Sequence, residues 1–204
     1  MDLFEAILFD FDGVIADSES VHFQSWGEIL APLGVPLSWE FYCASCIGVS
    51  DRKTVDLFCQ GLNYSVSQLD ELCIRKRELF RVKAVANPPI VESTRQLIRD
   101  LKGQYKLAVV TSSGRNEVQP VLEVTGLWNL LDTFVCMSDV ERLKPHPDPY
   151  LEAARRLNIK HALVVEDSDP GEASGRAAGF EVLRIAHPEK LSERVLGRLS
   201  DLPH

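Results

Sequence analysis

The sequence is short of basic residues and has no long apolar run. It holds 22 Lys and Arg against 30 Asp and Glu, a formal net charge of −8, whereas nucleic-acid-binding proteins present a broad basic surface. No apolar run approaches the ~20 residues of a membrane span, and no basic segment followed by an apolar one begins the chain as a signal peptide would. We therefore expect no nucleic-acid partner and no membrane insertion.

The cysteines lack the spacing of a metal site. Cys43 and Cys46 form a C-x-x-C, but no second cysteine pair or histidine pair follows at zinc-binding spacing. Five cysteines, an odd number, are most simply explained by free thiols in a reduced, cytoplasmic protein. Four of them lie between Cys43 and Cys73 among apolar residues, which predicts that they are small core side chains.

Short apolar segments alternate with segments of helical length. The predicted strands are residues 6–11, 106–111, 133–137, 162–166 and 181–185. The predicted helices between the last four are residues 117–125, 149–157 and 171–178. Strands that alternate with helices are typical of βαβ units, so the sequence predicts an α/β fold with a doubly wound, mostly parallel sheet.

The interval between the first two strands breaks this alternation. Residues 16–87 contain no convincing strand, and prolines and glycines divide them into several helical segments. Asn87, Pro88 and Pro89 mark the return to the sheet. We therefore predict an α/β core domain of residues 1–15 and 88–204 and a helical domain of residues 16–87, inserted after strand one.

The first strand leads directly into two carboxylates, Asp10 and Asp12, before Gly13. Side chains at i and i+2 of an extended segment point the same way, with Cα atoms ~7 Å apart. Two carboxylates at the end of a buried strand require a cation or a chemical role. The alternative is a pair of turn aspartates closed by the glycine.

Polar residues follow three of the other predicted strands. They are Thr111 and Ser112 after the second strand, Lys144 beyond the third, and Glu166 and Asp167 at the end of the fourth. Ligands of open parallel sheets bind beyond the carboxyl ends of the strands, and these groups suit a phosphate with a hard cation such as Mg²⁺. Singly, each has a plainer interpretation: a helix cap for Thr111-Ser112 and for Glu166-Asp167, and an exposed loop residue for Lys144. Their coincidence at one edge favours a site.

In order, these motifs resemble those of the haloacid dehalogenase superfamily: Asp10-Phe11-Asp12-Gly13-Val14, Thr111-Ser112, Lys144-Pro145 and Glu166-Asp167-Ser168. The segment from Asp17 to Trp26 is similar to the β-phosphoglucomutase-like subgroup, whose members carry a small helical cap after the first strand. That subgroup consists mostly of phosphatases of small phosphate esters, with some sugar-phosphate mutases.

The resemblance implies a role for each motif residue. Asp10 matches the nucleophile that forms an aspartyl-phosphate, Asp12 the general acid/base, and Lys144 the lysine that steadies nucleophile and phosphate. Thr111 and Ser112 match the phosphate-orienting motif. The implied Mg²⁺ ligands are the side chains of Asp10, Asp167 and Glu166 and the backbone carbonyl of Asp12.

Two polar residues of the helical domain lie on apolar stripes. Lys76 lies in the middle of the stripe formed by Leu69, Leu72, Cys73, Leu79 and Phe80, and His22 lies with Trp26, Ile29 and Leu33. Lys76 either extends its ammonium to solvent or faces the crevice between cap and sheet, and His22 is either a core histidine or a substrate contact. The resemblance implies substrate handling, because the mutases use a histidine and a lysine at matching positions.

One departure separates the two activities. Where the mutases place an arginine that holds the second phosphate of a bisphosphate, this chain has Asp51, and Arg52 follows one position later. A shift of one residue turns a helical side chain by about 100°. We therefore expect a Mg²⁺-dependent phosphatase of a small phosphate monoester, with a β-phosphoglucomutase-type mutase as the alternative and a non-catalytic phosphate-binding module as a third possibility. The expected partner is a small phosphorylated molecule, and the sequence gives no prediction of the oligomeric state.

Overall fold

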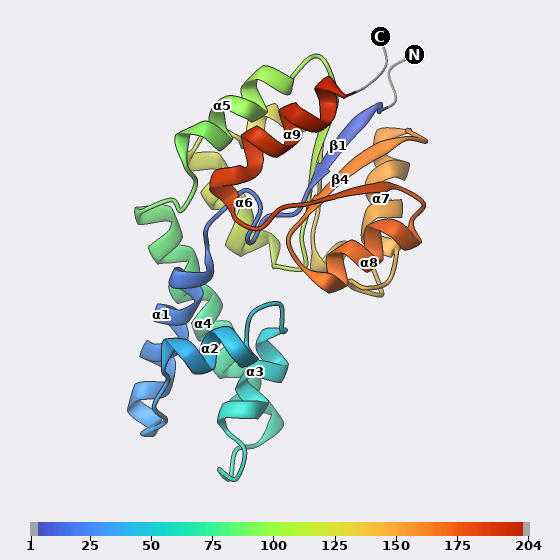
Figure 1. Cartoon of the computed structure of the whole chain (residues 1–204). Coiled ribbons are helices and arrows are strands. Elements are labelled where there is room, and N and C mark those ends of the chain that lie inside the picture. Colours follow the sequence, from blue (N-terminus) through green and yellow to red (C-terminus); the bar gives the residue numbers. More distant parts are fainter. Residues whose placement is uncertain (1–3, 202–204) are drawn as a thin grey trace. The chain divides into compact units, whose positions relative to one another are not determined.

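The computed structural model describes residues 4–201 and divides the chain into two compact units. The first unit contains the chain up to Asp17 and from Pro88 onward, and the second is Ser18–Asn87. Figure 1 colours the chain along its sequence and shows that the second unit is helical. The division lies close to the predicted domain boundaries at residues 15/16 and 87/88.

The first unit contains a five-stranded sheet in which neighbouring strands are parallel, in the order β3-β2-β1-β4-β5. The strands are β1 (Ala6–Phe9), β2 (Lys106–Val110), β3 (Thr133–Val135), β4 (Ala162–Glu166) and β5 (Glu181–Arg184). This confirms the predicted α/β class and mostly parallel sheet. Except for β4, the strands end one or two residues before the predicted limits. At three of these ends the next residue still makes a ladder-type bond: the N–H of Asp10 donates to Val165, that of Thr111 to Val135 and that of Ile185 to Glu166. After β1 and β2, the first polar side chains, Asp10 and Thr111, therefore lie where the regular pairing between strands ends.

Helices cover both faces of this sheet, as Figure 1 shows for the first unit. They are α5 (Glu92–Leu101), α6 (Arg115–Val124), α7 (Asp148–Leu157), α8 (Asp169–Ala177) and α9 (Leu191–Ser200). Side chains of β1, β2 and β4 on one face, among them Leu8, Val110 and Val164, pack with residues of α7, and α5, α6 and α9 lie on the other side. The three predicted helices correspond to α6, α7 and α8, which begin one or two residues earlier than predicted.

The second unit is a helical bundle without a strand among its residues, all of which the structure describes. Its helices are α1 (Glu19–Leu30), α2 (Trp39–Ser45), α3 (Asp51–Phe58) and α4 (Val66–Ala86). Serines before α2, α3 and α4 accept a hydrogen bond from a backbone N–H of the first turn, which explains where these helices begin.

The cysteines of the second unit behave mostly as predicted. Cys46, Cys59 and Cys73 are buried in its core beside Trp26, and all five cysteines of the chain are free thiols. Cys43 is exposed, so its prediction as a core residue is wrong. It lies on the short helix α2, where Tyr42 is the residue that faces the core.

Candidate active site

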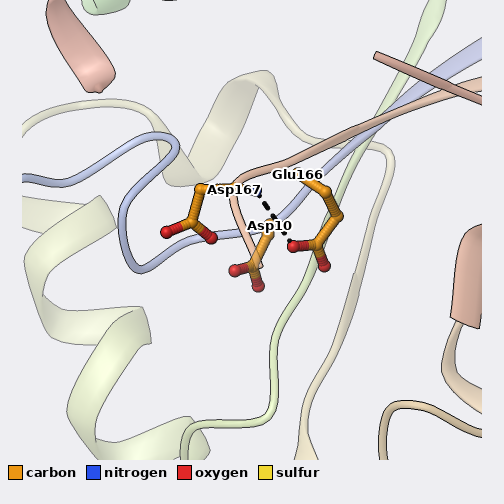
Figure 2. Close-up of side chains that lie close together, drawn as sticks. All are labelled: Asp10, Glu166 and Asp167. Atoms are coloured by element: carbon orange, nitrogen blue, oxygen red, sulfur yellow. Dashed lines mark hydrogen bonds between the residues drawn. The ribbon is translucent and has the colours of Figure 1, made fainter. Parts of the chain in front are cut away.

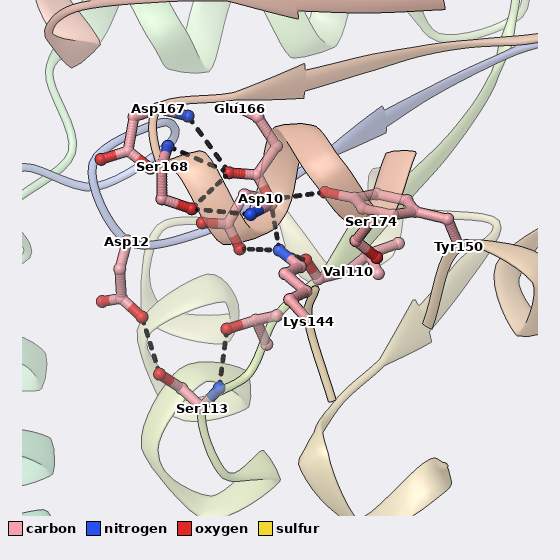
Figure 3. Close-up of polar contacts among 12 residues, drawn as sticks. Asp10, Asp12, Val110, Ser113, Lys144, Tyr150, Glu166, Asp167, Ser168 and Ser174 are labelled. Carbon is pink, nitrogen blue, oxygen red and sulfur yellow. Dashed lines mark hydrogen bonds and ion pairs between the residues drawn. The ribbon is translucent and has the colours of Figure 1, made fainter. Parts of the chain in front are cut away.

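The ammonium of Lys144 joins two carboxylates at the carboxyl ends of neighbouring strands. Its Nζ donates to Oδ1 of Asp10 at 2.8 Å, to Oε1 of Glu166 at 2.6 Å and to the carbonyl of Val110 at 2.9 Å. Asp10 directly follows β1, and Glu166 and Val110 are the last residues of β4 and β2, so the lysine connects the ends of three strands, as Figure 3 shows. Its side chain is only 6% exposed, which contradicts the alternative of a solvated loop lysine.

Glu166 is completely buried and surrounded by donors. Besides Lys144, its Oε1 accepts from the hydroxyl of Tyr150 at 2.7 Å, and its Oε2 accepts from the hydroxyl of Ser168 at 3.1 Å and from the N–H of Asp167 at 3.2 Å. A Cβ on Gly171, in the first turn of α8, would lie about 2 Å from this carboxylate. The helix therefore brings its amino-terminal end, the positive end of its dipole, directly against Glu166.

The caps of the two neighbouring helices exclude two plainer interpretations. The N-cap of α6 is Gly114, whose N–H donates to Glu117, rather than Thr111 or Ser112. The N-cap of α8 is Ser168, whose hydroxyl accepts from Gly171. Neither Thr111-Ser112 nor Glu166-Asp167 is therefore needed to cap a helix.

Three carboxylates come together closely enough to hold a metal ion. One oxygen each of Asp10, Glu166 and Asp167 lies within 4.8 Å of the others, and Figure 2 shows the three side chains close together. The turn after β1 also approaches this group: a Cβ on Gly13, whose φ is +73°, would lie 2.1 Å from Oδ2 of Asp167. Only a glycine can occupy this position without displacing the carboxylate.

The pKa shifts of Asp10 and Glu166 reflect the crowding of negative charge at this site. Burial raises the pKa of Asp10 well above its usual value despite Lys144, and the charges of Glu166, Asp12 and Asp167 add to the rise. For Glu166, burial acts in the same direction, but Lys144 and the other donors hold its pKa below the usual value. The one positive charge of Lys144 therefore offsets only part of the negative charge of these carboxylates. An oxygen-liganded divalent cation such as Mg²⁺ fits these residues, because it would stabilise their charged forms.

Asp12 is connected to the loop that follows β2. Its Oδ2 accepts a hydrogen bond from the hydroxyl of Ser113 at 2.7 Å (Figure 3), and the N–H of Ser113 donates to Oγ1 of Thr111 at 2.9 Å. Thr111 is buried, and the side chain of Ser112 is exposed. These contacts bring Asp12, Thr111 and Ser113 together, with Ser112 between the two loop residues in sequence.

Lys76 and His22 belong to the second unit and contact each other. Nζ of Lys76 lies 2.9 Å from Nδ1 of His22 and donates to Oδ1 of Asp51 at 2.6 Å. Both residues are buried, so the interpretation of Lys76 as a side chain that extends to solvent is wrong. That the two residues face the active site stays a prediction.

Sequence reasoning assigned no role to three residues of the site, namely Tyr150, Ser113 and Ser168, although Ser168 is part of the last motif. Tyr150 lies on the buried face of α7, and its sequence signal is a phenolic hydroxyl in an apolar stripe, which needs a buried partner. The two serines lie within the predicted motif loops, but their roles as donors to Asp12 and Glu166 depend on loop geometry.

Replacing Tyr150 by phenylalanine should lower the free energy of unfolding by about 2 kcal/mol, because a buried charged acceptor loses one of its donors. Denaturant titration measures this change. Tyr105→Phe is the matched control, because its hydroxyl has no hydrogen-bond partner within residues 4–201. Equal stability of the two variants would show that the bond from Tyr150 to Glu166 does not stabilise the fold.

Among the described residues, no helix is both long and apolar enough to cross a membrane.

The chain is similar to known proteins over most of its length. The profile of a family described as haloacid dehalogenase-like hydrolase matches residues 7–185. A phosphorylated carbohydrates phosphatase of Thermotoga maritima is 28% identical over 87% of this chain and 82% of its own length. A fructose-1-phosphate phosphatase of Escherichia coli is 27% identical over 89% of this chain and 96% of its own. The crystal structure of CbbY from Rhodobacter sphaeroides in complex with phosphate superimposes with a TM-score of 0.76 at 26% identity, covering 88% of this chain and 84% of that one.

Proposed function

The chain belongs to the haloacid dehalogenase-like hydrolase family, and we propose that it is a Mg²⁺-dependent phosphatase that hydrolyses a small phosphate monoester through an aspartyl-phosphate on Asp10. The observation that carries this proposal is the convergence of Asp10, Lys144, Glu166 and Asp167 at the carboxyl ends of three parallel strands. This arrangement provides a buried nucleophile, a fixed positive charge and oxygen ligands within one site.

Asp10 is the proposed nucleophile. Lys144 binds its Oδ1, which fixes the rotation of the carboxylate and leaves Oδ2 for attack on phosphorus. Burial opposes the charged form that a nucleophile must have, and the charge of Lys144 favours it. The pKa of Lys144, which burial would lower, is held well above its usual value by Asp10 and Glu166, so the lysine remains a cation. Covalent catalysis divides one difficult displacement into two easier steps.

Asp12 is the proposed general acid/base. It would protonate the leaving oxygen in the first step and remove a proton from water in the second. The hydroxyl of Ser113 binds Oδ2 of Asp12 and limits its rotation. We assign phosphate binding to the hydroxyl of Thr111 and to Ser112, which directly precedes Ser113 in the loop.

The residues that would hold Mg²⁺ are Asp10, Glu166 and Asp167 through their side chains and Asp12 through its backbone carbonyl. When bound, the ion supplies neutralisation of negative charge on the transferring phosphoryl group. The chain's own contribution is to keep the carboxylates close together: Lys144 and Tyr150 hold Glu166, and the glycine turn at Gly13 makes room for Asp167.

The substrate we propose is a sugar phosphate or a similar metabolite, because the relatives named above include phosphatases of fructose 1-phosphate and of phosphorylated carbohydrates. We further propose that residues 16–87 form a cap that selects the substrate and that residues 1–15 and 88–204 form the catalytic core. A mutase of the β-phosphoglucomutase type is the second candidate, favoured by the paired Lys76 and His22 and opposed by Asp51.

Phosphate release from a panel of small phosphate esters, with and without Mg²⁺, tests the proposal. Interconversion of β-glucose 1-phosphate and glucose 6-phosphate that depends on a bisphosphate, with little phosphate release, would establish the mutase instead.

Chelation with EDTA should abolish phosphate release, and added Mg²⁺ should restore it. Ca²⁺ should restore it poorly, because its longer and looser coordination displaces the carboxylates from the positions that attack requires. Asp167→Asn should also reduce the Mg²⁺-dependent rise in melting temperature, whereas the control Asp169→Asn, at a 96% exposed carboxylate, should not. Full activity after exhaustive chelation would contradict the metal assignment.

A further inference from the structure

The second unit holds a buried ammonium group in an unusual environment. Lys76 of α4 is 3% exposed, and its Nζ lies 5.6 Å from the ring centroid of Trp26 and 5.8 Å from that of Phe80. An ammonium only donates hydrogen bonds, so Nδ1 of His22 is the acceptor in this contact. Two aromatic rings and an imidazole nitrogen therefore lie close to this ammonium.

Asp51, the first residue of α3, supplies the negative charge. Its Oδ1 accepts from Lys76 at 2.6 Å and its Oδ2 from Nε of Arg77 at 2.9 Å, so one carboxylate bridges two successive cations of α4. Its side chain is 13% exposed. Burial would raise the pKa of Asp51, but Lys76 and Arg77 hold it below the usual value, and the group stays an anion.

The arrangement resembles a binding site whose anion is part of the chain. Within the described residues, Asp51 is the only carboxylate that contacts Lys76, and its two oxygens accept from the ammonium of Lys76 and from Nε of Arg77. The neighbouring Arg52 takes no part, because its guanidinium pairs with Asp56 and Asp70.

We propose that Asp51 is a specificity-determining residue, an internal anion that occupies the cationic centre of the cap and makes the enzyme select phosphate monoesters whose remaining part carries no second anionic group. This inference rests on the proposed function and on the second unit acting as a substrate-selecting cap. A second phosphate or carboxylate would have to displace Asp51 from Lys76 and Arg77 or lie beside a like charge, and like-charge contacts oppose binding. Hydroxyl groups of a polyol meet no such opposition.

The first experiment measures anion binding and needs no activity. Asp51→Asn keeps the shape of the side chain and removes the charge, so Lys76 loses its carboxylate partner. Sulfate should then raise the melting temperature of Asp51→Asn more than that of the wild type. Adding Lys76→Met to Asp51→Asn should cancel the gain. Asp70→Asn, which removes an exposed carboxylate of the same unit, is the matched control and should respond like the wild type.

The second experiment compares kcat/KM for fructose 1-phosphate and fructose 1,6-bisphosphate. The ratio should move toward the bisphosphate by about 10-fold or more in Asp51→Asn and stay unchanged in Asp70→Asn. Asp51→Ser, which leaves room for an anion, gives the same two measurements if Asp51→Asn does not fold. A folded variant with neither a sulfate gain nor a changed ratio would overturn the proposal. Failure of the proposed function would give a different result. The wild type would then release phosphate from neither ester, whereas the sulfate experiment would still show whether removing the charge of Asp51 creates an anion site.

Discussion

Asp10→Asn should keep the fold and lower kcat by at least about 10³-fold, a barrier increase of about 4 kcal/mol. The amide has nearly the same shape as the carboxylate, and its oxygen can still accept from Lys144, but it is a poor nucleophile. The fold should tolerate the change, because burial already raises the pKa of Asp10 and so opposes its charge. Circular dichroism and thermal unfolding verify the fold, and steady-state phosphate release measures the loss.

The matched control is Asp100→Asn, an exposed carboxylate on α5, which should leave kcat unchanged. Acid-stable labelling by a phosphorylated substrate separates the two steps further: the wild type should form a trappable phosphoenzyme and Asp10→Asn should not. Turnover near the wild-type value in a folded Asp10→Asn protein would exclude covalent catalysis at this residue.

The sheet could be predicted because buried parallel strands are continuous apolar runs. Two helices of the first unit, α5 and α9, were not predicted, although α5 carries its buried residues Thr94, Leu97, Ile98 and Leu101 at helical spacing. Helix α5 precedes the second strand and α9 follows the last one, so both lie outside the interval in which strands and helices alternate. The alternation of strands and helices therefore predicted only the helices that lie between the last four strands.

Asp10, Thr111 and Glu166 could be singled out from the sequence because each lies at the end of a strand or directly after it. Contacts between separate elements could not, since they depend on how helices pack. Tyr150 reaches Glu166 across 16 residues, and Lys76 reaches Asp51 across 25. The sequence predicted that Asp51 disfavours a second phosphate, but not that its carboxylate is bound by the lysine beside it in space.

Asp12→Ala should slow the first chemical step most for substrates with poor leaving groups. A sugar alkoxide needs a proton as the bond to phosphorus breaks, and general acid catalysis contributes about 10²–10⁴-fold to such steps. An aryl oxide leaves without this help, so the first step with an aryl phosphate should change far less. Ser113→Ala is the control, because it removes only the hydrogen bond to Asp12 and should have a smaller effect.

The same variant should also slow the second step, equally for both kinds of substrate, because Asp12 activates the water that hydrolyses the shared aspartyl-phosphate. With an aryl phosphate, Asp12→Ala should therefore release one burst of phenol per active site and then turn over slowly, with phosphoenzyme accumulating on Asp10. Rapid-mixing measurement of phenol release and trapping of the phosphoenzyme test both parts. Equal slowing of the first step for alkyl and aryl substrates, without accumulated phosphoenzyme, would show that Asp12 positions the nucleophile, since its backbone lies two residues along the turn that leads from Asp10 to Gly13.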